Sequence, residues 1–144
     1  MMERGLNKVM IIGELGRDPE MRYTPSGRPV TTFNVASTRS WNSSDGERHS
    51  ETEWFNIVAW GSLAEICKQH LCKDQPVYIE GRLQTRVWED ANGNKRSSTE
   101  IVAKEMIVLG ESTEKTLEEE TDLQLDEFSL WNWKELNARN YDNL

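Results

Sequence analysis

Segments with the composition of β-strands contain four tryptophans: Trp41, Trp54, Trp60 and Trp88. An indole ring offers a flat π-surface on which a nucleobase stacks, with about 1 to 3 kcal/mol per base. Arg86 lies two residues before Trp88 and therefore on the same face of a strand, since side chains alternate with period two. Aromatic surfaces beside cations suit an unpaired nucleic-acid strand, which has bases to stack and phosphates to neutralise.

Cations elsewhere in the chain would extend these surfaces toward phosphates. Lys8 begins the first strand-like run, Lys73 follows a helical segment, and Lys95 and Arg96 occupy a predicted hairpin loop. Aromatic residues are also enriched where protein subunits meet, so a subunit interface is the alternative interpretation of the tryptophans. Because four tryptophans occur together on the polar and basic faces of the strands, the pattern favours nucleic acid.

The stretch TEWFNIVAWG indicates how a strand presents these rings. Its alternation places Trp54 and Trp60 on one face, and Phe55, Ile57 and Ala59 on the other. The second face is apolar enough to form part of a barrel core. We therefore expect both tryptophans on the outer surface.

The stretch PVYIEGRLQTRVW shows the same alternation. One face carries Arg86 and Trp88 and is expected on the outer surface of the barrel. We expect Trp41 and the other tryptophans on this outer surface as well. The opposite face is expected inside the barrel. Its members are Val77, Ile79, Gly81, Leu83, Thr85 and Val87.

The order of the predicted elements indicates the fold. Turn residues separate five strand-like runs from one another and from a helix, at whose start Ser62 and Glu65 match a capping box. The strands are expected at 7–15, 30–41, 52–61, 76–88 and 99–110, and the helix at 62–71. One helix between the third and fourth of five strands predicts an all-β, five-stranded OB-fold, which is a Greek-key barrel.

The acidic charge of the chain is concentrated in its last segment. The whole chain has a net charge of -8. Residues 1–110 contain 14 Lys+Arg and 15 Asp+Glu, giving -1, whereas residues 111–144 contain 3 and 10, giving -7. We therefore expect an OB-fold domain at 1–110 and an acidic, Trp-containing tail at 111–144.

The sequence contains little that indicates catalysis or a cofactor. Cys67 and Cys72 are the only cysteines and are five residues apart in a helical segment, so neither a disulfide nor a metal pair is expected. His49 and His70 have no nucleophile or patterned carboxylate pair beside them. We expect no enzymatic activity, no cofactor and no metal. No apolar run is long enough to span a bilayer, so the protein is expected in the cytoplasm.

The chain resembles the bacterial single-stranded DNA-binding protein family over roughly residues 4–110, in four motifs: RGLNKVMIIGELGRDPEMRYTPSG, TEWFNIVAWGSLAE, VYIEGRLQTRVWED and TEIVA. The resemblance implies an OB barrel that coats single-stranded DNA without strong sequence preference in replication, recombination and repair. It also implies a homotetramer. The DNA-binding positions of the family fall on Arg4, Lys8, Trp41, Trp54, Trp60, Lys73, Arg86 and Trp88.

Some cations seen in relatives are replaced here by uncharged residues, at Asn56, Ser62, Gln84 and Val87. Fewer phosphate contacts predict a shallower salt dependence, since the slope on single strands is about -0.7 per neutralised phosphate. The alternative function is therefore an OB-fold interaction protein, primosome-like or regulatory, with weakened DNA binding.

The tail departs most from the family. Relatives carry an acidic tip that recruits replication and repair enzymes, and the nearest equivalent here is Asp126, Glu127 and Phe128. These three are the candidate partner-binding residues. Two alternatives remain open. The acidic tail could fold back and mimic DNA across the protein's own DNA-binding groove, or its Trp-rich end could dock on a neighbouring subunit.

Overall fold

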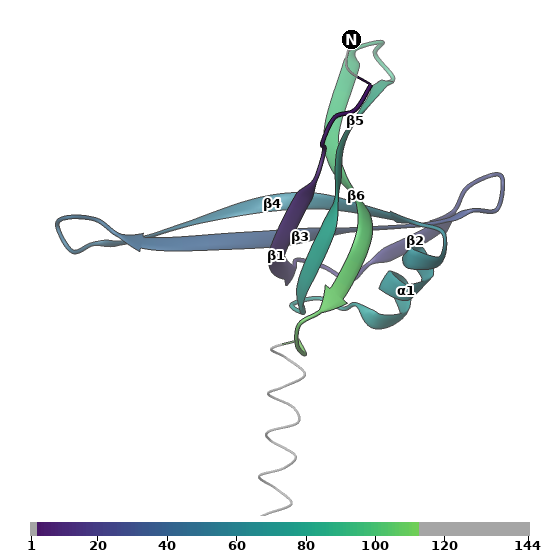
Figure 1. Cartoon of the computed structure of the whole chain (residues 1–144). Coiled ribbons are helices and arrows are strands. Elements are labelled where there is room, and N and C mark those ends of the chain that lie inside the picture. Colours follow the sequence, from purple (N-terminus) through teal and green to yellow (C-terminus); the bar gives the residue numbers. More distant parts are fainter. Residues whose placement is uncertain (1–2, 113–144) are drawn as a thin grey trace, which may run out of the picture. The chain divides into compact units, whose positions relative to one another are not determined.

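Six β-strands and one α-helix form residues 3–112, the part of the chain that the computed structural model describes. The strands are β1 (Val9–Leu15), β2 (Glu20–Tyr23), β3 (Pro29–Asn42), β4 (Arg48–Trp60), β5 (Pro76–Glu89) and β6 (Lys95–Val108). The helix α1 (Ser62–His70) lies between β4 and β5 (Figure 1). It is not long and apolar enough to cross a membrane.

Five of the strands close into a barrel, which confirms the predicted OB-fold. The sheet order is β1-β5-β6-β4-β3-β2, and an additional pairing of β1 with β3 closes the ring at Glu14 and Leu15. The remaining strand, β2, lies outside this ring and was not predicted. It pairs only with β3 in antiparallel register, so it extends the sheet beside the barrel.

The inward faces of the barrel strands form a dense apolar core. Phe33 and Val35 of β3, Ile57 of β4, and Val77 and Ile79 of β5 are each at most 1% exposed. In β3 and β5 these residues alternate with half-buried ones, as the period of a strand requires, whereas in β4 the outward Val58 is also buried, at 7% exposure. The prediction of which faces enclose the core is therefore correct for the barrel part of β4 and β5.

The helix packs on β3 and β4 and buries Ala64 and Cys67. Burial raises the pKa of the Cys67 thiol to about 11, so this residue is an unreactive part of the core. The buried Thr31 hydroxyl donates a hydrogen bond to the Ala64 carbonyl oxygen over 2.7 Å. Both cysteines are free thiols in the structure.

The predicted capping box at the start of the helix is wrong. Gly61 is the N-cap, with a φ of 63°, and no side chain caps the first turn. Ser62 is already the first helical residue. The chain turns from β4 into α1 within a single residue, and the positive φ of that turn is one that glycine adopts without steric cost.

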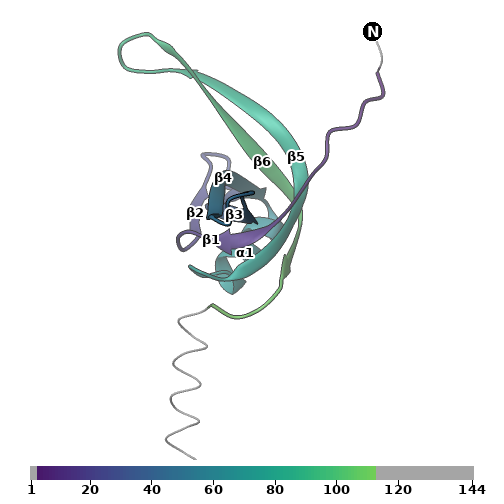
Figure 2. The same ribbon diagram turned by 90° about the vertical axis from the view of Figure 1, so that its left-hand side faces the viewer.

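Two hairpins extend beyond the barrel in different directions (Figures 1 and 2). The β3–β4 arm comprises residues 38–52, and the β5–β6 arm comprises residues 82–100; their strands pair along their whole length. A β-bulge between Glu80 and Gly81 marks the point where β5 leaves the barrel.

The predicted inner face of β5 is wrong beyond this bulge. Leu83 is 46% exposed and Val87 is 63% exposed, although both alternate in phase with the buried Val77 and Ile79. Alternation continues along a strand that has left the core, so it does not indicate where burial ends.

Candidate nucleic-acid interface

Two predicted stacking residues lie on the outer face of β4, as expected. Trp54 is 56% exposed, and Trp60 is half-buried. The Trp54 ring lies directly over Gly16, where an added Cβ would come within 2.4 Å of the indole Cζ3. Glycine at this position therefore gives the ring its place beside the barrel.

Trp60 is accompanied by a cation that the sequence did not suggest. The Arg28 guanidinium lies 4.9 Å from the centroid of the Trp60 ring. Arg28 belongs to the loop before β3, and Val30 of that strand is the register partner of Trp60. The strand pairing thus places a loop cation on an aromatic ring that is remote in sequence.

Trp41 lies on the β3–β4 arm and is 43% exposed. The Arg39 guanidinium lies 4.8 Å from its ring centroid and 2.9 Å from Oε2 of Glu51 on the opposite strand. His49 is the register partner of Trp41 on β4. Its imidazole stacks against the Trp41 ring, with centroids 5.6 Å apart and an interplanar angle of 23°.

The predicted placement of Trp41 on the same outer face as Trp54 is wrong. Ala36 pairs with Trp54, and Trp41 pairs with His49, in one continuous register. Paired residues share a face, and Ala36 and Trp41 are an odd number of residues apart. Trp41 therefore lies on the opposite face of the ribbon, the face that continues the core side of β3.

The β5–β6 arm carries a closely similar arrangement around Trp88, which is 42% exposed. The Arg86 guanidinium lies 5.2 Å from the Trp88 ring centroid and 3.1 Å from Oε1 of Glu100. At the tip, Asp90 accepts hydrogen bonds from the Asn94 backbone and from Arg96, which lower the pKa of its carboxyl group. The tip is thus an ordered turn rather than a loose loop.

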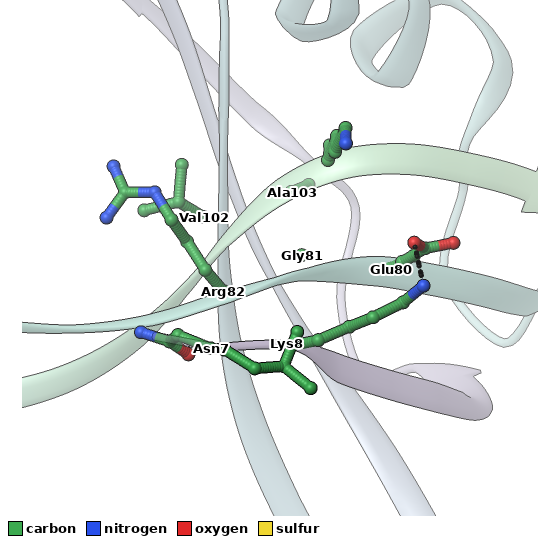
Figure 3. A pocket seen from close by; sticks show the side chains of 9 residues that line it. Asn7, Lys8, Glu80, Gly81, Arg82, Val102 and Ala103 are labelled. Atoms are coloured by element: carbon green, nitrogen blue, oxygen red, sulfur yellow. Dashed lines mark ion pairs between the residues drawn. The ribbon is translucent and has the colours of Figure 1, made fainter. Parts of the chain in front are cut away.

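Lys8 lies where β1 meets β5. Its ammonium lies 2.9 Å from Oε1 of Glu80, and this hydrogen-bonded pair raises the pKa of Lys8 and lowers the pKa of Glu80 (Figure 3). Asn7 beside it makes two 2.9 Å hydrogen bonds to the backbone of Leu83. The segment that carries Lys8 is therefore fixed along β5.

A hollow of about 560 Å³ adjoins this pair (Figure 3). Its walls include three cations, Lys8, Arg82 and Lys104, and one acid, Glu80. The surplus of cations makes the foot of the β5–β6 arm a surface on which a phosphate would be stabilised.

The remaining predicted residues are more dispersed. Arg4 is exposed ahead of β1, and Lys73 is exposed after α1, where its backbone N–H donates a 2.8 Å hydrogen bond to Asp18. Asp126, Glu127 and Phe128 lie outside the described residues.

A model of the family described as "Single-strand binding protein family" matches residues 6–109. The chain belongs to this family. A relative from Chlorobaculum tepidum, named single-stranded DNA-binding protein 1, is 54% identical over 110 residues, which are 76% of this chain and 68% of the relative. A single-stranded DNA-binding protein from Neisseria meningitidis serogroup A is 50% identical over 105 residues, covering 73% of this chain and 60% of the relative.

Solved structures with a similar fold come from the same family. A Plasmodium falciparum SSB in complex with ssDNA matches 76% of this chain and its own entire chain, with 31% identity and a TM-score of 0.68. A deletion mutant of the single-stranded DNA-binding protein from Thermus aquaticus matches 76% of this chain and 53% of its own, with 34% identity and a TM-score of 0.65.

Proposed function

We propose that this protein binds and protects single-stranded DNA without strong sequence preference, in replication, recombination and repair. The observation that carries the proposal is the threefold pairing of an indole ring with a guanidinium. Arg28, Arg39 and Arg86 lie 4.9, 4.8 and 5.2 Å from the ring centroids of Trp60, Trp41 and Trp88, respectively.

This pairing accounts for a preference for single strands. A base with an exposed π-face stacks on the indole, while the phosphate next to it is neutralised by the neighbouring arginine. In a duplex the bases are already stacked and paired, so only the phosphate contact remains. The names of the two relatives and the Plasmodium falciparum complex support the same ligand. Stacking and charge neutralisation break no covalent bond, so we infer no catalysis and no cofactor.

A titration of intrinsic tryptophan fluorescence with oligo(dT) tests the proposal. Base stacking on the exposed rings should quench the emission in a saturable manner at micromolar protein, with weaker binding at higher salt. Double-stranded DNA of the same length is the control and should produce little quenching. An unchanged spectrum with the single strand would contradict the proposal.

One observation favours the alternative function, an OB-fold interaction protein with weakened DNA binding. Three of the candidate cations, Lys8, Arg39 and Arg86, each form an ion pair with a glutamate 2.9 to 3.1 Å away. A paired cation attracts a phosphate less strongly than a free one. The alternative predicts dissociation constants above the micromolar range at physiological salt, which the same titration measures.

We also propose self-association through the outer face of β1, β5 and β6. Met10 and Ile12 are more than 60% exposed, and the register places Ile12, Tyr78 and Ile107 side by side on one face. Exposed apolar patches of this kind are typical of protein interfaces. We expect a homotetramer in light scattering at micromolar concentration and a smaller species for Ile12→Asp; a monomeric wild type would contradict this assembly.

The division into a DNA-binding domain at 1–110 and an acidic tail at 111–144 is part of the proposal. We infer that Asp126, Glu127 and Phe128 recruit replication or repair enzymes. A chain truncated after Gly110 should bind oligo(dT) as the full chain does but lose the enzymes that co-purify with it. Tighter DNA binding after truncation would instead indicate that the tail mimics DNA, and loss of assembly would indicate docking on a neighbouring subunit.

A further inference from the structure

We propose that His49 and Arg39 form, together with Trp41, a separate nucleotide-binding station on the face of the β3–β4 arm opposite to Trp54. The proposal depends on the proposed binding of single-stranded DNA: it adds His49 to the pairing of Arg39 with Trp41 and makes the three residues one site. Neither His49 nor Arg39 is among the binding residues expected from the sequence.

The register of the arm defines the station. Trp41 pairs directly with His49, and Arg39 pairs directly with Glu51, so the four side chains share one face of the ribbon. Trp54 and its partner Ala36 lie on the other face, which also carries the hydrogen-bonded Thr38 and Thr52 hydroxyls. The station therefore does not continue the Trp54 surface.

The contacts within the station give each group a role. The rings of Trp41 and His49 are stacked on each other, so the imidazole extends the stack that begins at the indole, and both residues belong to strands rather than to a loop. Trp41 retains 43% of its surface for a ligand. A base stacks on this ring pair, with the imidazole also able to donate or accept a hydrogen bond.

Arg39 supplies the contact to phosphate. Its Nε and Nη2 both lie within 3.1 Å of Glu51 Oε2, which holds the guanidinium beside the Trp41 ring. The arginine side chain is 75% exposed, so it can exchange the carboxylate for a phosphate without leaving the ring. A strand that uses both this station and Trp54 must cross an edge of the arm.

The test compares two substitutions of His49 in the full chain. The anisotropy of a labelled oligo(dT) gives the dissociation constant without depending on tryptophan emission. We expect His49→Ala to weaken binding about fivefold, the low end of the effect of losing one stacked base, and His49→Phe to remain within about twofold of wild type. His70→Ala is the matched control, since it removes the other histidine at an exposed position on α1, and it should have no effect.

Circular dichroism melting verifies that each variant is folded. Arg39→Gln tests the phosphate contact independently of the stacking. This variant should weaken binding and reduce the slope of log affinity against log salt by about 0.7. Unchanged or tighter binding by His49→Ala would overturn the proposal, as would a His49→Phe variant as weak as His49→Ala. A wild type that does not bind oligo(dT) would instead refute the proposed function itself.

Discussion

The two arms contain the same three-residue arrangement, built from different strands. In the β3–β4 arm, Arg39 lies over Trp41 and pairs with Glu51; in the β5–β6 arm, Arg86 lies over Trp88 and pairs with Glu100. The arginine precedes the tryptophan by two residues in both arms, because that spacing places both side chains on one face of a strand. The glutamate comes from the opposite strand of each hairpin.

The differences between the arms lie in what surrounds this arrangement. The Glu51 side chain is 48% exposed, whereas that of Glu100 is only 16% exposed. Trp41 has a second ring stacked against it, while the register partner of Trp88 is Arg96, which pairs with Asp90. The comparison shows that an exposed hairpin can hold a stacking surface and a cation in place without a core beneath them.

The largest effect is expected when both arms lose their indole rings. Trp41→Ala and Trp88→Ala should each weaken oligo(dT) binding about 5-fold to 150-fold, since stacking contributes about 1 to 3 kcal/mol per base. If the arms act independently, the losses multiply in the double variant to at least about 25-fold. Anisotropy of labelled oligo(dT) measures all three. Tyr23→Ala, which removes an exposed aromatic ring from β2, is the control; a double variant no weaker than either single one would show that the arms are not separate stations.

Much of the barrel followed from the sequence because alternation and burial coincide there. Ile57 and Ala59 were predicted inside and are fully buried. The short strand β2 could not be predicted, because its four residues, EMRY, have no apolar alternation and form a strand only by pairing with β3. The exposure of Leu83 and Val87 depends on where β5 leaves the barrel, which a local pattern does not contain.

The site was less predictable because it depends on register between strands. The tryptophans themselves could be selected by composition, and the opposite face of Trp41 could have been inferred, since it alternates in phase with Phe33 and Val35. The Arg-x-Trp spacing, at 39–41 and 86–88, was a further signal. The contribution of Arg28 was hidden, because only the pairing of Val30 with Trp60 brings that loop to the ring.

A matched pair on β5 tests whether the arms are energetically separate from the barrel. Val77 is fully buried and Val87 is 63% exposed, although both belong to the same strand and the same alternation. We expect Val77→Ala to lower the free energy of unfolding by about 2 kcal/mol, from lost burial and a cavity, and Val87→Ala to change it by less than about 0.5 kcal/mol. Urea denaturation measures both. A loss of similar size in Val87→Ala would mean that the arm is packed, for example against another subunit.

The smallest effect is expected from the acids that hold the arginines. Glu51→Gln and Glu100→Gln each free a guanidinium for phosphate, so binding to oligo(dT) should tighten by up to about fivefold, the upper range for an exposed ion pair. The slope of log affinity against log salt should become steeper by about 0.7, because one more phosphate is neutralised. The change should be larger for Glu100, whose carboxylate is less screened by solvent than that of Glu51.

Glu53→Gln, on the same face of β4 as Glu51, removes the same charge from a residue without an ion pair among residues 3–112 and is the control. Weaker binding by either arm variant would mean that the glutamates orient the arginines for DNA rather than compete with it.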